Sequence, residues 1–168
     1  SIAFTYKGDI YTVPVNGGKA AQITTNAAHD THPVWSPDGK QIAFASDRMG
    51  SMDIFVVDRE GGIPKRLTTH SGNETPVAFK DADHILFLAN VMPSAEDAQF
   101  PSGQFQQVYE VSTTGDRPVM FSSMPMEDIS INKTGNALLY HDKKGYEDPW
   151  RKHHTSSITR DIWLCSLD

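Results

Sequence analysis

A unit of about 44 to 54 residues recurs four times along this chain. Each copy holds a short apolar run such as IAF or LLY, followed by a second run such as DIYTV or DIFVV. The first runs begin at Ile2, Ile42, Ile85 and Leu138. The second runs contain Tyr11, Phe55, Tyr109 and Trp163, which are 44, 54 and 54 residues apart. A repeat of this length, with several short strands in each copy, is typical of the blades of a β-propeller.

The second copy is expected to form four strands, called A to D in chain order, at residues 33–36, 41–46, 53–57 and 65–68. The turn SPDG between strands A and B has Pro and Gly where a type I turn prefers them. In strand C, Ile54 and Val56 point one way, whereas Phe55 and Val57 point the other. A strand that is apolar on both faces must be covered on both, as stacked blades cover one another.

Copy one lacks a strand A and copy four lacks a strand D. The sequence therefore predicts an all-β chain, a β-propeller fragment of about three and a half four-stranded blades, approximately residues 1–24, 25–68, 69–121 and 122–168. One alternative is a complete four-bladed propeller in which the two incomplete copies pair with each other. Because a blade needs a neighbour on each side, incomplete end blades predict self-association of the chain.

Composition narrows the classes of partner. The net charge is −6 over 168 residues, and the one basic cluster, within residues 143–152, is interrupted by two acidic residues. Nucleic-acid binding requires clustered cations, and a membrane helix requires about 18 consecutive apolar residues, so neither is expected. The single cysteine, Cys165, excludes an internal disulfide and replaces the valine of the other copies, which predicts a small buried hydrophobe. The compartment, cytoplasmic or extracytoplasmic, stays undetermined.

The order of strands in a blade places the D–A and B–C loops on one face of the propeller. The D–A loops carry polar residues that are expected near one mouth of the central channel: His29, Asp30, His32, Asn73, Glu74, Glu127 and Asp128. They predict either a polar substrate-lining gate or only turn-capping and packing roles. The segment HDTH lacks a helix that would align its two imidazoles, so no metal and no cofactor is expected.

Two B–C loops on the same face are unusually long, at residues 90–106 and 141–160. Long loops in compact domains are usually functional or disordered, so these two indicate a docking surface. In the second loop, Trp150, Arg151, His153 and His154 are candidate contacts to a protein or peptide. No nucleophile elbow, phosphate loop or other catalytic motif is present, so no catalytic residue is assigned.

The segment HPVWSPDGKQIAFASDRMGSMDIFVVDREGGIPKRLT resembles the propeller repeat shared by TolB and the tricorn proteases. YKGDIYTVPVNGGKAAQIT and WRKHHTSSITRDIWL are similar to the N-terminal propeller of bacterial tricorn-like serine peptidases. The resemblance implies a six-bladed propeller in an oligomeric peptidase, with a channel that guides peptides to a distant active site. It also implies that the catalytic residues lie in C-terminal domains, and none matches a position here.

Three hypotheses of function follow. The first is a non-catalytic propeller portion of a tricorn-like serine peptidase that gates or binds peptides and mediates assembly with the rest of its parent chain. The second is a TolB-like adaptor that binds protein partners. The third is a metal-dependent propeller lyase. The histidines argue against it, because they do not recur at equivalent positions and therefore form no ring of metal ligands. This chain alone is not expected to be an enzyme.

Overall fold

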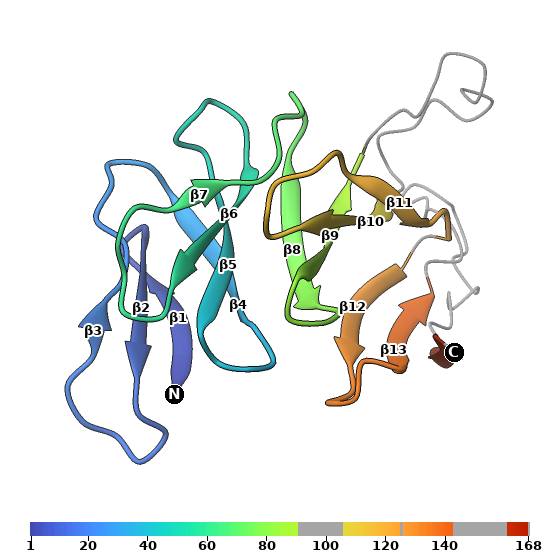
Figure 1. Cartoon of the computed structure of the whole chain (residues 1–168), viewed down its shortest axis with the longest axis horizontal. Helices are drawn as coiled ribbons and strands as arrows, with labels where there is room; N and C mark the ends of the chain where they lie inside the picture. The colour runs from blue at the N-terminus through green and yellow to red at the C-terminus, as the bar shows by residue number, and fades with distance from the viewer. Residues whose placement is uncertain (91–105, 125, 143–160, 168) are drawn as a thin grey trace, which may run out of the picture.

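In the computed structural model, residues 1–90, 106–124, 126–142 and 161–167 are described, and all their regular structure is β-strand (Figure 1). They form four antiparallel sheets. Blade 1 contains β1 (Ile2–Tyr6), β2 (Asp9–Val13) and β3 (Ala21–Gln22). Blade 2 contains β4 (Asp30–Trp35), β5 (Gln41–Ser46), β6 (Asp53–Asp58) and β7 (Lys65–Arg66). Blade 3 contains β8 (Glu74–Phe79), β9 (His84–Ala89), β10 (Gln107–Ser112) and β11 (Val119–Ser122). Blade 4 contains β12 (Met126–Ile131), β13 (Ala137–Asp142) and β14 (Ile162–Ser166).

These sheets confirm the predicted fold class. In blades 2 and 3, each strand pairs with the next along the chain, in the A-B-C-D order expected of a propeller blade. Blade 1 has the three strands B, C and D, and blade 4 has A, B and C. The end blades form separate sheets, so they do not combine into one blade of a closed four-bladed ring. Strand A of blade 2 begins at Asp30, three residues before the predicted start.

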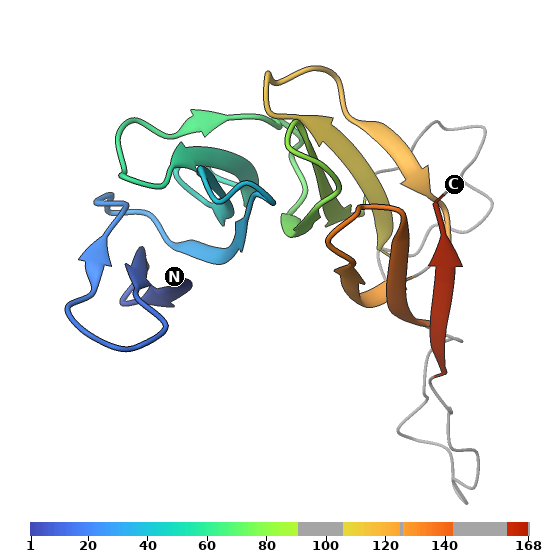
Figure 2. The ribbon, with the colours of Figure 1, turned by 60° about the horizontal axis from the view of Figure 1, so that its bottom comes forward.

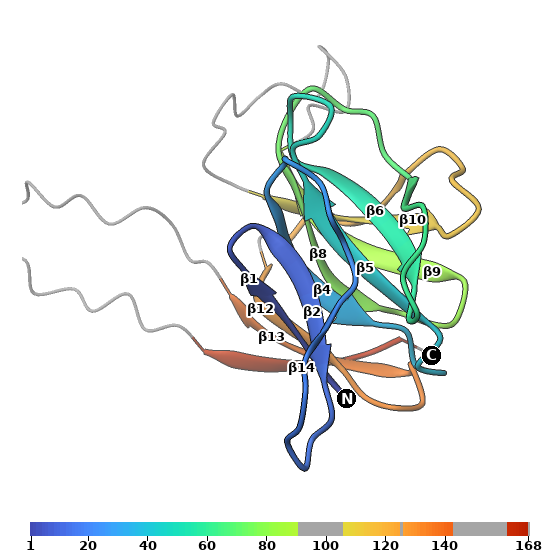
Figure 3. The ribbon, with the colours of Figure 1, turned by 90° about the vertical axis from the view of Figure 1, so that its left-hand side faces the viewer.

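The four sheets follow one another in an open arc (Figure 2). The inner, concave side carries β4, β8 and β12, the first strands of their blades, whereas β7 and β11 lie on the convex side. Viewed from blade 1, the sheets stand one behind another (Figure 3). Strands A of neighbouring blades therefore form the wall of the central channel, as they do in complete propellers.

The same cross-strand pair of rings recurs from blade to blade. Register places Phe4 opposite Tyr11, Phe44 opposite Phe55, and Phe87 opposite Tyr109. The ring centroids of these pairs are 5.9, 5.9 and 5.8 Å apart, and all three pairs are stacked. Aromatic cross-strand pairs stabilise a sheet by roughly 0.2–1 kcal/mol each and fix its register. The repeated aromatic residue of the sequence is thus the anchor of each blade.

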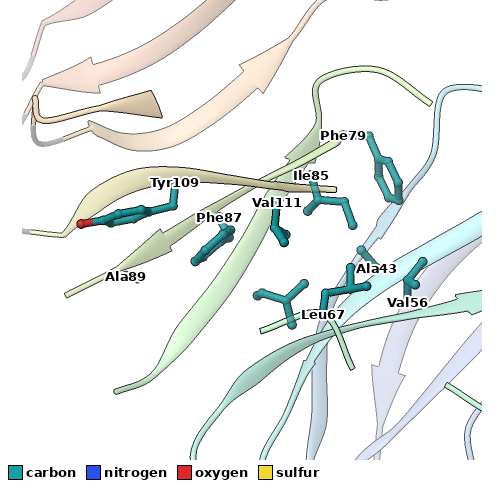
Figure 4. Packing of buried hydrophobic residues seen from close by; sticks show 10 residues of the cluster. Ala43, Val56, Leu67, Phe79, Ile85, Phe87, Ala89, Tyr109 and Val111 are labelled. Carbon is teal, nitrogen blue, oxygen red and sulfur yellow. The ribbon is translucent and has the colours of Figure 1, made fainter. Parts of the chain in front are cut away.

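Buried side chains gather between the blades. One cluster joins blades 1 and 2 and includes Phe44, Phe55 and Val57. A second joins blades 2 and 3 and includes Ile54 and Val56 (Figure 4). The two faces of β6 therefore pack into different clusters, as the alternation in the sequence predicted. A third cluster joins blades 3 and 4, and Cys165 packs against it as a partly buried side chain.

The turn between strands A and B is built alike in two blades. Gly39 and Gly135 each donate a backbone hydrogen bond to the first residue of their turn and have φ values of +69° and +73°. Glycine adopts this left-handed conformation at little cost. At Gly135 a Cβ atom would also lie 2.7 Å from the carbonyl oxygen of Lys80 in blade 3, so this turn contacts its neighbour closely.

The outward face of blade 4 is apolar and exposed. On β14, Ile162 and Leu164 are 69% and 72% exposed, and Trp163 is 49% exposed. Trp163 occupies the position of Phe55, on the face of the strand opposite to Ile162 and Leu164. Ile162 and Leu164 occupy the positions of Ile54 and Val56, which pack against the following blade 3, so their exposure reflects the absence of a further blade beside them among the described residues. That same part of the chain contains no helix long and apolar enough to cross a membrane.

Candidate functional site

The seven residues expected at the channel mouth divide into two groups. Asp30 and Glu74 are the first residues of β4 and β8, and they are only 0% and 1% exposed. The remaining residues are partly or fully exposed: His29, His32, Asn73, Glu127 and Asp128. The convergence of all seven on one mouth stays a prediction.

The exposed residues make contacts that explain their positions locally. Asn73 Oδ1 accepts a hydrogen bond from the backbone N–H of Met52 at 3.2 Å. His32 and Asp128 occupy the same position in blades 2 and 4, with φ values of +53° and +51°, where the pairing of strands A and B shifts register. His and Asp tolerate this left-handed conformation better than most residues. From the sequence, both a substrate-lining role and a turn-capping or packing role are open for these residues, and this β-bulge is not predicted.

Asp30 forms a buried ion pair across the start of blade 2. Its two carboxylate oxygens lie 2.8 and 2.9 Å from Nη2 of Arg48, and its backbone N–H donates to Gly8 of blade 1. The guanidinium of Arg48 also lies over the rings of Phe44 and Phe55, at 5.4 and 4.6 Å from their centroids. Arg48 thus fills the space above the aromatic pair, and Asp30 neutralises its charge.

Glu74 takes the same position in blade 3 but has different neighbours. Its carboxylate accepts a hydrogen bond from the hydroxyl of Thr68, and its backbone N–H donates to Met52 of blade 2. Burial raises the pKa of Glu74 to about 7, and the nearby Asp53 carboxylate adds to the rise. At pH 7 this carboxyl group is therefore about half ionised.

Asp53 and Arg66 form a second buried pair beside Glu74. Arg66 Nη2 lies 2.8 Å from Asp53 Oδ2, yet in the described part of the chain neither carboxylate oxygen receives a well-directed hydrogen bond. Burial raises the pKa of Asp53 although Arg66 opposes the rise. Two buried carboxyl groups thus share the space between the blades with one guanidinium, which leaves an excess of negative charge when both are ionised.

A cavity of about 440 Å³ opens next to Glu74, between blades 2 and 3. Its apolar lining includes Phe87, Tyr109 and Met120, and its polar lining includes His70 and Glu74. The Nδ1 atom of His70 accepts a hydrogen bond from Gly72 N–H at 2.9 Å, so the D–A loop holds this ring in place. The rest of the lining is Thr69, Arg117 and Pro118. Of the seven predicted residues, Glu74 is the one that lines this cavity.

A second cavity, of about 620 Å³, lies on the channel wall and is lined by strands β4, β8 and β12 and their turns. Its floor is apolar, with Val34, Trp35 and Phe79 among the lining residues, and Lys80 and Lys133 supply positive charge. The indole N–H of Trp35 is buried and has no acceptor among the described residues. The repeat in the sequence indicates a strand A in several copies of the unit. That three of these strands together line one cavity follows only from the arrangement of the blades in an arc.

Other sequence predictions lie elsewhere. Trp150, Arg151, His153 and His154, and most of both long loops, fall outside the described residues. Within the described residues, no three His, Cys, Asp or Glu side chains are grouped so that they could hold a metal ion.

Related proteins share part of this sequence. Tricorn protease homolog 1 of Streptomyces coelicolor is 37% identical over 82 residues, which are 49% of this chain and 8% of the relative. The uncharacterized peptidase YuxL of Bacillus subtilis is 32% identical over 89 residues, which are 52% of this chain and 14% of the relative. The chain therefore spans only a small part of the length of these curated relatives.

Solved structures share the fold. A putative TolB from Agrobacterium tumefaciens superposes with a TM-score of 0.66 at 21% identity, over 95% of this chain and 53% of that protein. The tricorn protease superposes with a TM-score of 0.57 at 15% identity, over 96% of this chain and 15% of that protein. The family model of the tricorn protease N-terminal β-propeller domain matches residues 1–168, and the chain belongs to that family.

Proposed function

We propose that this chain is a non-catalytic propeller portion of a tricorn-like serine peptidase and that its channel wall binds peptide substrates of that enzyme. Membership of the tricorn N-terminal propeller family and the relation to a tricorn protease homolog support the parent activity. The single observation that carries the binding role is the cavity of about 620 Å³ across β4, β8 and β12. Its size is within the range of ligand sites, roughly 300–1,000 Å³.

The chemistry of this cavity suits a peptide main chain. Strands β4, β8 and β12 are edge strands, each at one end of its sheet, so their outer backbone groups face the channel. Edge strands bind extended peptides through main-chain hydrogen bonds. Trp35 adds apolar surface to the lining, and the apolar floor accepts side chains of many shapes. Such a surface favours unfolded peptides with little sequence preference.

A fluorescent-peptide binding assay tests this proposal. Anisotropy of labelled ten-residue peptides of mixed sequence is expected to rise on addition of the chain, without cleavage of the peptide. Trp35→Phe makes the apolar lining of the cavity smaller, so the peptide affinity should fall about three- to tenfold, which corresponds to roughly 1 kcal/mol of lost apolar contact. Trp163→Phe, on the exposed edge of blade 4, is the matched control and should bind normally.

Two results would contradict the proposal. Equal affinity of the Trp35→Phe variant and the unchanged chain would remove the channel wall from the binding site. Hydrolysis of a peptide, stopped by a serine-reactive reagent that labels this chain, would show that the chain is itself catalytic.

We also propose a role in assembly, in which the isolated chain pairs with a second copy through its end blades. The support is the pair of exposed apolar residues Ile162 and Leu164 on the outward face of β14, together with the half-exposed Ile2 and Tyr6 on β1. Exposed apolar strands at the edge of a sheet are prone to associate. Pairing of two such ends would cover both sets of residues and extend the arc toward a ring.

A further inference from the structure

Strand A begins with a buried acidic residue in both blade 2 and blade 3. Among the described residues, only in blade 2 does an arginine of the same blade pair with this residue. In blade 2, Asp30 starts strand A and the stacked rings Phe44 and Phe55 lie beside it. The guanidinium of Arg48 binds Asp30 and covers both rings. Ser46 supports it further, because its hydroxyl oxygen accepts a hydrogen bond from Arg48 Nε at 2.9 Å.

Blade 3 has the same frame around a cavity. Glu74 starts strand A, and register places the stacked rings of Phe87 and Tyr109 where blade 2 has Phe44 and Phe55. Glu74 and both rings line the cavity of about 440 Å³ (Figure 4 shows the two rings on neighbouring strands). The acid and the aromatic pair that hold a guanidinium in one interface thus border an open space in the next.

The sequence explains the difference. The segment IAFASDR, residues 42–48, aligns with ILFLANV, residues 85–91, so the position of Arg48 holds Val91 in the third copy. Valine carries no charge that could neutralise Glu74. The hydroxyl of Ser46 is likewise replaced by Ala89. Blade 3 therefore keeps the recognition elements for a guanidinium group but has no arginine at the position that supplies one in blade 2.

The charges around the cavity favour a cation. Glu74 is 1% exposed, and Asp53 beside it is already paired with Arg66. His70 accepts a hydrogen bond at Nδ1, so the proton of the neutral ring is on Nε2, which is a donor. Arg117 lines the cavity from the C–D turn, and as an exposed side chain its charge is largely screened by water. Ionised Glu74 is thus the one buried carboxylate of the described lining that lacks a cationic partner of its own.

We propose that this interblade cavity binds the guanidinium group of an arginine side chain on a peptide, stacked on Phe87 and Tyr109 and paired with Glu74. The identification of the carrier as a peptide rests on the proposed function; the preference for guanidinium rests on the comparison of the two blades. No bond is made or broken in this step. A planar guanidinium combines stacking with a directed ion pair, which a lysine ammonium cannot do as well.

Titration with small arginine analogues tests the proposal without a peptide main chain. N-acetyl-L-argininamide is expected to saturate one site on the chain, monitored by calorimetry and NMR shifts. N-acetyl-L-citrullinamide has nearly the same shape without the charge, and it should bind at least about tenfold more weakly, the expected loss of a buried charge-assisted contact. Equal binding of the two compounds, or no saturable binding of the arginine compound, would overturn the proposal.

Two variants locate the site. Glu74→Gln should weaken binding of N-acetyl-L-argininamide about tenfold or more, whereas Glu60→Gln, at an exposed carboxylate that pairs with Arg59, should leave it unchanged. Met120→Arg places a guanidinium at the cavity wall, as Arg48 does in blade 2, and should block the ligand while the chain stays folded. Unchanged affinity in both cavity variants would place the arginine elsewhere and refute the assignment.

The pH dependence supplies an independent readout. Since the pKa of Glu74 is about 7, its ionised fraction rises about tenfold between pH 6 and pH 8, and affinity for the arginine compound should rise with it. The other titratable or charged groups remain in the Glu74→Gln variant: His70, Tyr109 and Arg117 in the lining, and Asp53 and Arg66 beside Glu74. The rise should vanish in that variant. A rise that persists there would assign it to another group and contradict the ion pair.

These results separate the inference from the proposed function. Trp35→Phe should weaken the binding of peptides at the channel wall but leave the affinity for N-acetyl-L-argininamide unchanged. If peptides do not bind while the arginine compound does, the peptide-binding proposal fails and the guanidinium site stands.

Discussion

Replacement of Phe55 by alanine tests whether the blades are held by their interblade cores. The Phe55 side chain is 2% exposed, and its ring is stacked on Phe44 with 5.9 Å between centroids. Arg48 covers the other side at 4.6 Å and pairs with Asp30. Phe55→Ala would therefore empty part of the core between blades 1 and 2 and remove the surface on which a buried ion pair rests.

The expected loss can be worked out from burial. A phenylalanine buried in a core contributes about 3–5 kcal/mol relative to alanine, which includes the cavity that the ring leaves behind. The stacked ring and the cation over it place Phe55 in the upper half of that range, at about 4–5 kcal/mol. Trp163 occupies the same repeat position but is 49% exposed, so about half its area, roughly 100 Å², is buried. At about 25 cal/mol per Å², Trp163→Ala should cost only about 2 kcal/mol.

Urea unfolding followed by far-ultraviolet circular dichroism measures both losses. The unchanged chain should give a strand-dominated spectrum, and the two variants should keep it in the absence of urea. A loss for Phe55→Ala below about 1 kcal/mol would place the ring outside the core and refute the interblade packing. A larger loss for Trp163→Ala than for Phe55→Ala would refute the claim that burial decides the contribution of this repeat position.

Three further outcomes are expected. Because the pKa of Glu74 is raised from 4.5 to about 7, ionisation of its carboxyl group destabilises the fold as pH rises through that window. Glu74→Gln should therefore be stabilised relative to the unchanged chain by on the order of 2–3 kcal/mol at pH 8 and not at pH 4; a constant difference in thermal unfolding would contradict this linkage. In urea unfolding, Gly135→Ala should lower the free energy of unfolding by about 1–3 kcal/mol more than Gly39→Ala does, because both glycines have positive φ but only Gly135 contacts a neighbouring carbonyl. Equal losses would mean that the turn does not contact blade 3. Light scattering should show dimers at tens of micromolar that Leu164→Glu converts to monomers, whereas a monomeric unchanged chain would refute self-association.

Much of the fold could be predicted because the repeat is written in the sequence. The alternation in Ile54, Phe55, Val56 and Val57 requires cover on both faces of one strand, and the structure supplies it from two different clusters. The start of strand A was placed three residues late, at Pro33, since its first residue is fixed by a backbone hydrogen bond from Asp30 to Gly8 of the preceding blade. A contact between blades has no local sequence signal.

The candidate site was less predictable from the sequence. Glu74 was expected near one mouth of the channel, and that placement stays a prediction. Nothing in the sequence indicated that its carboxyl group is buried between blades, where Thr68 donates to it. Trp35 was not singled out, because nothing in the sequence shows that its indole N–H would lack an acceptor beside a channel cavity. Whether a side chain is buried, and whether it finds a hydrogen-bond partner, depends on the residues that pack around it. The sequence pattern within one copy of the repeat does not contain this information.

The sequence by itself determined the unit: a run of short strands with apolar residues on both faces, an aromatic anchor and glycine turns, because strand periodicity and turn geometry are local. Only the tertiary structure decided how equivalent residues differ. Asp30 and Glu74 hold the same repeat position, yet the first is neutralised by Arg48 and the second borders a cavity. Val56 and Leu164 likewise hold the same repeat position and differ in burial, because blade 3 covers Val56 and no following blade covers Leu164 among the described residues. The charge and the exposure of a position depend on what packs against it, which is set by the arrangement of blades in space.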